Sequence, residues 1–453
     1  MKIIIIGCGK VGYTLVEQLS EDGHDLVVVD ENPNQVKHLT DDLDAMGIVG
    51  NGLSYQTLQD ADVKHADLVI AVTGSDEQNL LCCVIAKKAS HCHTIARVRN
   101  PIFNKQADFL REEFDLAMII NPEYAAACEI ARIFQFPSAI KIDTFSRGHM
   151  EMYHFRLGKN SPLIDQKVLT IRASMHCDVL VSIVTRGDEV IIPNGNFIFQ
   201  ESDTVAFISN PKNAHEFFHK LNVETNPVKN AMIVGGGKIA YYLTERLIEN
   251  GIRTMIIETS HERCEFLSDR LPKATIINGD GTDQKLLLQE GLANVDGFAA
   301  LTGMDEENIL LSLYAKGVSE LKAVTKINRI KFTGVINSLS LDSIIYPRLI
   351  TADLITKYVR SMNNSKDSNV ETFYRLEDGR AEALEFIIHD ASPVVNIPLQ
   401  ELKLKKNILI GCLSRKGRLI IPSGQDSIQI GDSVVIIMLN DYRISDITDI
   451  LES

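Results

Sequence analysis

The stretches "MKIIIIGCGKVG" (1–12) and "MIVGGGKIA" (232–240) place nearly the same glycine pattern at two points of one chain. In each, a short apolar run leads directly into closely spaced glycines. Glycines that follow a buried strand and open a helix are typical of a turn that cradles the phosphates of a nucleotide. The recurrence of the pattern indicates that the chain contains an internal repeat.

Segments outside the glycine pattern repeat as well. "DLVIAVTGSDEQNLL" (67–81) matches "DGFAALTGMDEENIL" (296–310), and further on "VTRGDEVIIPNG" (184–195) matches "LSRKGRLIIPSG" (413–424). Each half of the chain therefore contains a longer unit and a shorter one. The predicted domains, in the order A–B–A′–B′, are 1–136, 145–225, 229–362 and 370–453.

Units A and A′ alternate apolar runs with helical stretches. Runs such as "KIIIIG" and "DLVVVD" are typical of strands that are buried on both faces. Ser75 with Gln78, and Asn121 followed by Pro122, are typical of helix starts. The alternation predicts an α/β fold with two Rossmann-like domains, each a doubly wound parallel sheet.

Units B and B′ carry short alternating runs around turns. Arg186-Gly187-Asp188 and Lys416-Gly417 stand between two such runs and predict hairpins. Each unit is therefore predicted to be a small α+β module that follows a Rossmann-like domain.

The composition of the chain narrows the range of possible functions. The 453 residues carry a net charge of -14, which argues against nucleic acid as a partner, because phosphate binding needs clustered lysine and arginine. No apolar run approaches the length that spans a bilayer, and no signal peptide is evident. The eight cysteines follow no regular spacing, so we expect reduced thiols in the cytoplasm.

The glycines and one acid predict a nucleotide site in unit A. In Gly7-x-Gly9-x-x-Gly12, the first glycine permits the tight turn, the second admits a pyrophosphate, and the third lets helix and strand pack closely. Asp30 ends the second predicted strand, where an acid binds ribose hydroxyls. The acid would repel a 2′-phosphate, which favours NAD or adenine nucleotides over NADP.

Unit A′ repeats the arrangement with two changes. Gly235-x-Gly237-x-x-Ala240 ends in alanine, and Glu258 takes the place of the aspartate. A second nucleotide site is therefore predicted. The alternative is a retained fold with a weakened pocket.

Further candidates lie where the other strands end. Thr73–Gly74 and Thr302–Gly303 follow the fourth strands, where ligands bind in such sheets, although plain helix capping is an equal alternative. Asn51 and Asp280 follow the third strands and are placed to touch adenine or its ribose. The fifth strands contain Arg97 and Lys326, whose charge suits a phosphate or carboxylate; the alternative is a surface salt bridge.

Two short motifs resemble metal sites. "HEFFH" (215–219) matches a zinc-protease pattern, and "HCH" (91–93) lies near two further cysteines. Neither has a counterpart in the other half of the chain. We interpret both as coincidences, with Phe217 and Phe218 forming an apolar helix stripe, and expect no metal.

The A–B–A′–B′ pattern resembles the TrkA family, the cytosolic regulatory subunits of bacterial Trk-type potassium uptake, which are built from tandem RCK (KTN) domains. The resemblance covers nearly the whole chain. It rests on "IIIIGCGKVG", "AVTGSDEQN", "IARVRNP", "MIVGGGKIA" and "LTGMDEENI", and on β modules of the TrkA-C type.

The resemblance implies a regulatory nucleotide, either NAD(H) or ATP/ADP, and a ring of subunits beneath a potassium-translocating membrane protein of the TrkH type. It implies a homo-oligomer, a tetramer by our expectation, at the inner face of the cell membrane. Ala240 and Lys326 depart from the family pattern. By position, the implied ligand contacts are Gly7, Cys8, Gly9, Lys10, Val11, Gly12, Asp30, Asn51, Thr73, Gly74 and Arg97, and in the second unit Gly235, Gly236, Gly237, Lys238, Ile239, Ala240, Glu258, Asp280, Thr302, Gly303 and Lys326.

An NAD-dependent dehydrogenase is the alternative function. Such an enzyme needs a substrate domain with a proton donor and a substrate anchor beside the nicotinamide. The β modules carry no clustered acid–base set, so we favour a regulator that is not an enzyme. For assembly, the apolar stripes of "PEYAAACEIARIF" and "PRLITADLITKYV" are expected to contact other copies of the chain, and ordinary core packing is the alternative.

Overall fold

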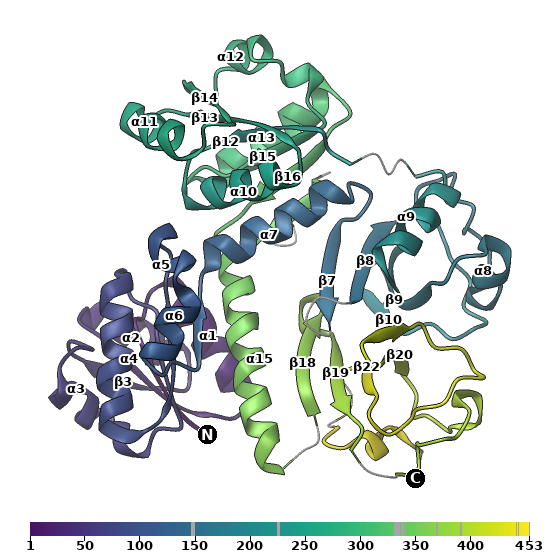
Figure 1. Cartoon of the computed structure of the whole chain (residues 1–453), viewed down its shortest axis with the longest axis horizontal. Helices are drawn as coiled ribbons and strands as arrows, with labels where there is room; N and C mark the ends of the chain where they lie inside the picture. Colours follow the sequence, from purple (N-terminus) through teal and green to yellow (C-terminus); the bar gives the residue numbers. More distant parts are fainter. Residues whose placement is uncertain are drawn as a thin grey trace. The chain divides into compact units, whose positions relative to one another are not determined.

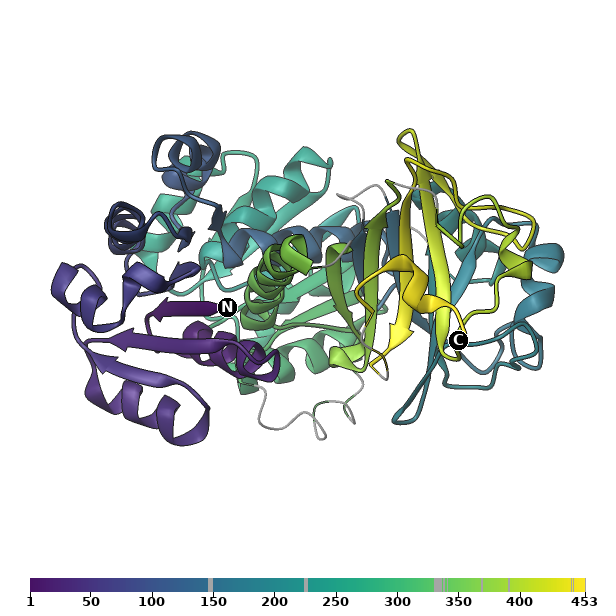
Figure 2. The ribbon, with the colours of Figure 1, turned by 90° about the horizontal axis from the view of Figure 1, so that it is seen from below.

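The structure, a computed structural model, describes residues 1–145, 150–223, 227–329, 336, 339, 341–367, 370–389, 392–440, 442 and 444–452. The chain divides into two compact units, which are shown in Figures 1 and 2. The first unit combines Met1–Ile130 with Lys229–Thr356, and the second combines Ala131–Val228 with Lys357–Ser453. Among the described residues, no helix is both long and apolar enough to cross a membrane.

The first unit contains two six-stranded parallel sheets. Their strand orders, β3-β2-β1-β4-β5-β6 and β14-β13-β12-β15-β16-β17, are the doubly wound order of dinucleotide-binding folds. The predicted Rossmann-like fold class is therefore confirmed. The strands are β1 (Lys2–Ile6), β2 (Asp25–Asp30), β3 (Met46–Val49), β4 (Leu68–Ala71), β5 (His93–Arg97), β6 (Met118–Ile120), β12 (Asn230–Val234), β13 (Arg253–Glu258), β14 (Thr275–Asn278), β15 (Gly297–Ala300), β16 (Lys322–Lys326) and β17 (Ser343–Ile345).

Helices connect these strands, and the predicted helix starts are confirmed. The Ser75 hydroxyl accepts a hydrogen bond from the backbone of Gln78, and Asn121 does the same for Tyr124. The helices are α1 (Lys10–Glu21), α2 (Pro33–Asp42), α3 (Tyr55–Asp60), α4 (Asp76–Ser90), α5 (Pro101–Lys105), α6 (Ala107–Glu113), α7 (Pro122–Gln135), α10 (Lys238–Glu249), α11 (His261–Arg270), α12 (Gln284–Gln289), α13 (Asp305–Val318) and α15 (Pro347–Asp367).

Each Rossmann-like domain receives the last helix of the other one. On α15, Asp353 and Thr356 hydrogen-bond to the amide of Gln18 on α1, at 3.1 and 2.9 Å. In the opposite direction, the Asn121 amide at the start of α7 donates to the Tyr242 hydroxyl on α10, at 2.9 Å. Figure 1 shows α15 beside the first domain and α7 beside the second. This exchange joins the two domains.

The exchange corrects the expectation that these two helices contact other copies of the chain. Ala127 and Ile130 of α7 and Ala352 and Ile355 of α15 are fully buried within one chain. The apolar spacing correctly indicated burial. It could not indicate that the other half of the same chain, rather than another copy, covers these residues.

The second unit contains two five-stranded sheets, in the orders β10-β9-β11-β8-β7 and β18-β19-β22-β20-β21. All their strand pairs are antiparallel, and the predicted hairpins are present at Gly187 and at Lys416-Gly417. The elements are β7 (Lys141–Phe145), β8 (Met150–Arg156), α8 (Val168–Met175), β9 (Leu180–Arg186), β10 (Glu189–Ile191), β11 (Thr204–Ser209), α9 (Pro211–Lys220), β18 (Val370–Leu376), β19 (Ala381–Ile387), β20 (Ile408–Arg415), β21 (Arg418–Ile420) and β22 (Ser433–Leu439).

The two modules of this unit share one apolar core. Met152 and Ile208 of the first module pack with Leu376 and Ile437 of the second. Each sheet therefore buries one face against its own helices or loops and the other against its repeat.

A buried ion cluster lies between these modules. His154 on β8 is nearly fully buried, with Nε2 2.8 Å from the Asp143 carboxylate and Nδ1 3.0 Å from the Glu377 carboxylate. Burial alone would lower the pKa of His154, but the two carboxylates outweigh burial and raise that pKa to about 9. The protonated imidazole therefore links the two repeats.

Ile130→Asp is expected to destabilise the folded chain by about 4 kcal/mol, because it places an unpaired charge in a sealed core. Denaturant unfolding monitored by circular dichroism measures the change. Ile130→Val is the matched control and should cost about 1 kcal/mol. A variant that keeps its stability and merely separates into smaller assemblies would contradict the burial argument.

His154 is expected to make stability fall in alkaline solution. Its pKa is higher in the folded chain (about 9) than the ordinary value of about 6.5, so its contribution is complete below about pH 6.5 and is lost as the pH rises through 9. The measurement is the unfolding free energy of the native protein and His154→Gln between pH 6 and pH 10. The difference between the two should shrink as the pH rises, and a constant difference would disprove the assignment.

Candidate functional site

A cavity of about 480 Å³ opens at the carboxyl ends of the strands in the first Rossmann-like domain. It brings together the glycine turn, the acid that ends β2 and the polar ends of β4 and β5. Of the predicted contacts in this domain, only Cys8 and Gly12 do not line it. Those that do are Gly7, Gly9, Lys10, Val11, Asp30, Asn51, Thr73, Gly74 and Arg97.

The three glycines of the turn have distinct physical reasons to be there. Gly7 has φ +108°, a conformation that side chains other than hydrogen disfavour. A Cβ on Gly12 would lie 1.9 Å from the Gly7 carbonyl oxygen, so this position must be glycine for α1 to pack. A Cβ on Gly9 would meet nothing within 4 Å, which leaves room for a ligand at the helix start.

Asp30 fixes the turn from the next strand. Its two carboxylate oxygens accept hydrogen bonds from the backbone N–H groups of Cys8, at 2.7 Å, and Asn32, at 2.8 Å. Each oxygen retains a lone pair that can accept a further hydroxyl hydrogen. The acid is therefore a structural part of the turn and remains able to accept from a ribose.

The second domain repeats this contact with a longer acid. Glu258 accepts from the N–H groups of Gly236 and Ser260, both at 2.7 Å. Partial burial alone would raise the pKa of Glu258, but these backbone donors lower it overall, so the group is a carboxylate at neutral pH. Ala240 is fully buried where the first domain has Gly12, and Gly235 has φ +97° like its counterpart.

The sequence Thr-Gly-x-Asp-Glu-x-Asn, which both domains contain, ties β4 to β5. The side-chain oxygen of Asn79, a fully buried residue, accepts from the Thr73 N–H at 2.7 Å, and its amide donates to the Arg97 carbonyl at 2.9 Å. Asp76 accepts from the N–H groups of Arg99 and Asn100. In the second domain, Asn308 and Asp305 make the equivalent contacts.

Sequence reasoning missed these asparagines and aspartates, although their recurrence in both repeats was a visible signal. The residues after the third strands also have a structural role. Asn51 and Asp280 each accept from a backbone N–H two residues on, at 2.7 and 2.8 Å, and so build the turns there. Thr302 and Gly303 lie at the end of β15, as Thr73 and Gly74 lie at the end of β4.

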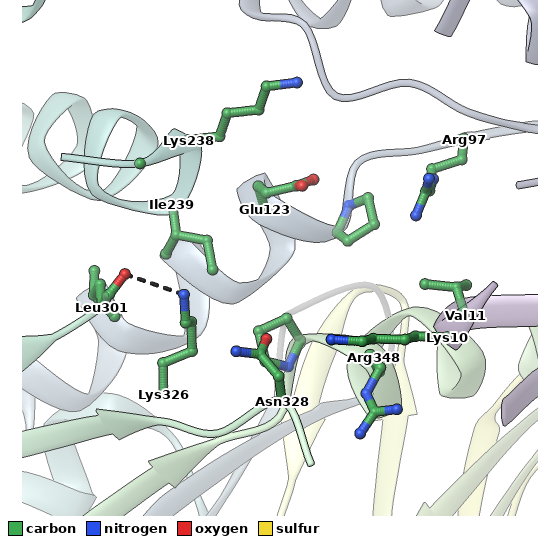
Figure 3. Close-up of a pocket in the computed structure, with 13 residues that line it drawn as sticks. Lys10, Val11, Arg97, Glu123, Lys238, Ile239, Leu301, Lys326, Asn328 and Arg348 are labelled. Carbon is green, nitrogen blue, oxygen red and sulfur yellow. Dashed lines mark hydrogen bonds between the residues drawn. The ribbon is translucent and has the colours of Figure 1, made fainter. Parts of the chain in front are cut away.

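A second cavity, of about 320 Å³, lies between the two Rossmann-like domains of the first unit. It shares the lining residues Lys10, Val11 and Arg97 with the first cavity, so the two cavities are neighbours. Lys238, Lys326 and Arg348 reach it from elements of the second half (Figure 3). Five residues with cationic side chains, two from the first half and three from the second, therefore line this one cavity.

Among the described residues that line this second cavity, Glu123 at the start of α7 is the sole acid. Burial raises the pKa of Glu123, while Arg99, Arg97 and Lys238 act in the opposite direction. Burial lowers the pKa of Lys326 and of Arg348. The charges of the lining residues leave a net positive space that can stabilise a bound anion.

Helix starts add to this positive potential. Lys10, Lys238, Pro122 and Pro347 are the first residues of α1, α10, α7 and α15, and all four line the second cavity. Unpaired N–H groups at a helix start carry partial positive charge. Glu123 and Arg348 are corresponding residues of the two repeats. Sequence reasoning missed both, because they reach the second cavity only through the exchange of the helices that carry them.

The residues of the two metal-like motifs differ in burial. Phe217 and Phe218 of "HEFFH" are fully buried on α9, as their predicted apolar stripe requires. In "HCH", Cys92 is buried whereas His91 and His93 are exposed. Among the described residues, no group of three or more histidine, cysteine, aspartate or glutamate side chains could hold a metal ion.

Known proteins share this arrangement over the whole chain. The TrkA-N domain family matches residues 3–122 and 231–347, and the TrkA-C domain family matches residues 152–222 and 383–446. The Trk system potassium uptake protein TrkA of Haemophilus influenzae is 31% identical over 459 aligned positions, which cover 100% of this chain and 99% of that protein.

Solved structures share the fold at low sequence identity. The GsuK RCK domain has a TM-score of 0.65 at 16% identity and covers 97% of this chain and 92% of that chain. The GsuK channel bound to NAD has a TM-score of 0.64 at 16% identity, with coverage of 97% and 77%. With the family domains in the same A–B–A′–B′ order and this identity over its full length, the chain belongs to the TrkA family of Trk system potassium uptake proteins.

Proposed function

We propose that the chain is a nucleotide-binding regulatory subunit of a potassium uptake system. In this proposal NAD(H) or ATP/ADP binds the Rossmann-like domains and switches a potassium-translocating membrane subunit of the TrkH type. The observation that carries the proposal is the pairing of glycine turn and acid, made twice with the same backbone hydrogen bond. The cytoplasmic, membrane-peripheral location follows from the same role.

The cavities support an anionic adenine nucleotide. In the first, Asp30 stands where ribose hydroxyls are accepted, and Gly9 leaves space at the start of α1 for phosphate. Lys10 and Arg97 belong to both cavities, so phosphates at the helix start would lie at their junction. GsuK, which has the same fold, has been solved bound to NAD.

The proposal excludes redox catalysis. A dehydrogenase needs a proton donor beside the nicotinamide, and none of the described residues that line the first cavity is a histidine or tyrosine. Cys82 lines this cavity, but burial raises its pKa to about 12, which keeps the thiol protonated. The bound nucleotide would therefore act through its binding energy alone.

We propose a homo-oligomer, with a tetramer supplying eight Rossmann-like domains for a closed ring. Because the apolar residues Ile130 of α7 and Ile355 of α15 are buried within the chain, we propose that other apolar residues make the contacts. Leu81 on α4 and Leu310 on α13 occupy corresponding positions of the two repeats and are 49% and 67% exposed. Such matched apolar residues suit contacts that repeat around a ring.

The test combines binding, turnover and transport. The purified chain should bind NADH, ATP or ADP in calorimetry with up to two sites per chain, and should not oxidise NADH with small oxo acids. In cells that lack their own subunit, it should restore nucleotide-dependent rubidium uptake. Absence of nucleotide binding, or NADH turnover that a mutation in this chain abolishes, would refute the proposal.

Asp30→Ala is expected to weaken adenine-nucleotide binding at the first site about tenfold or more, because it removes a charged acceptor worth about 1.5–3 kcal/mol. Calorimetry in a Glu258→Ala background isolates that site. Asp30→Asn, which keeps one oxygen for the backbone of the turn, is the matched control and should lose less affinity. Equal dissociation constants for native and Asp30→Ala sites would contradict the role of the acid.

A further inference from the structure

The two glycine turns differ in the side chain that accompanies them. Gln35 is the fifth residue after Asp30, and Arg263 is the fifth residue after Glu258. Gln35 lines the cavity of the first domain. The corresponding position of the second domain therefore carries a cation where the first carries a neutral amide.

Arg263 is fixed against the second glycine turn. Its Nε donates to the Gly236 carbonyl oxygen at 2.6 Å, while Glu258 accepts from the N–H of the same glycine at 2.7 Å. The guanidinium lies 4.6 Å from the centre of the Phe266 ring. The carbonyl and the N–H group of Gly236 are thus hydrogen-bonded to two side chains of opposite charge, Arg263 and Glu258.

The residue in the middle of the turn differs between the two domains as well. The first domain has Cys8 there, and the second has Gly236, whose missing Cβ would lie 2.8 Å from Leu267. Among the described residues, none accepts a hydrogen bond from the terminal nitrogens of Arg263, so these donors remain for a ligand. A guanidinium that already makes one hydrogen bond and packs on one aromatic ring loses little conformational entropy when it binds an anion.

The charges around the two acids differ accordingly. In the first domain the carboxylates of Asp30 and Glu31 line the cavity beside Gln35, together with the cations Lys10 and Arg97. In the second, Lys238 and Lys326 repeat these two cations and Asp280 stands where the first domain has Asn51, so Arg263 beside Glu258 is an additional cation. An anionic nucleotide therefore meets a less repulsive potential at the second turn.

We propose that Arg263 is a specificity-determining residue that makes the second site the tighter of the two for anionic adenine nucleotides. The inference rests on the proposed nucleotide-binding function. It assigns the difference in nucleotide affinity between the two sites to position 263. In this inference the effect of Arg263 is larger than the effect of replacing the last glycine by Ala240. It also implies that NADH and ADP fill the second domain first.

Single-site backgrounds test the proposal. Calorimetry with ADP and with NADH is carried out on Asp30→Ala, which leaves the second site, and on Glu258→Ala, which leaves the first. Adding Arg263→Gln to the former should raise its dissociation constant about tenfold, and adding Gln35→Arg to the latter should lower it. Arg270→Gln is the matched control, since it removes the same charge from the same helix, 5.3 Å from the same ring.

The outcomes separate the inference from the function on which it rests. A selective loss in Arg263→Gln, with little change in Arg270→Gln, supports the proposal. Equal losses of affinity in both variants would show that the effect comes from the overall charge of the helix. Tighter binding in Arg263→Gln would show that the arginine obstructs the site. Either result overturns the proposal. Failure of the native chain to bind any nucleotide would overturn the proposed function itself.

Discussion

The exchange of α7 and α15 between the two Rossmann-like domains is the constraint on which the first unit depends. Each helix leaves the sheet that precedes it and buries its apolar face against the other domain, where Gln18 and Tyr242 provide polar anchors. Fully buried Ile130 and Ile355 show that this is core packing rather than a loose surface contact.

The second cavity follows from this exchange. Because the exchanged helices begin at the boundary between the domains, Glu123 and Arg348 meet cations that come from distant parts of the chain. Clustered like charges in a partly buried space raise the free energy of the empty protein and are relieved by an anion. The arrangement thus costs stability, and in the proposed function this cost prepares a binding site, a common pattern at functional positions.

The amino-acid sequence predicted the sheets more completely than the site. Strands such as β1, with Ile3 to Ile6 buried on both faces, are visible as continuous apolar runs, and the glycine spacing located the turns. Arg263 and Arg348 were not predicted, since a single charged residue on a helix is normally solvated. Asn79 and Asp76 recurred in both repeats, but recurrence alone does not reveal that they hold backbone N–H groups of a neighbouring strand.

In the proposed function, the two exchanged helices also connect the nucleotide site with the rest of the chain. Both begin at the second cavity, with Pro122 and Pro347, and both continue past the first unit, which ends at Ile130 and Thr356. A helix transmits displacement along its axis because its backbone hydrogen bonds keep it stiff. An anion at these helix starts would stabilise whichever position of α7 and α15 brings the cations closest to it. The difference between the anion's affinities for the two positions of the helices sets how far the anion can shift the equilibrium between them.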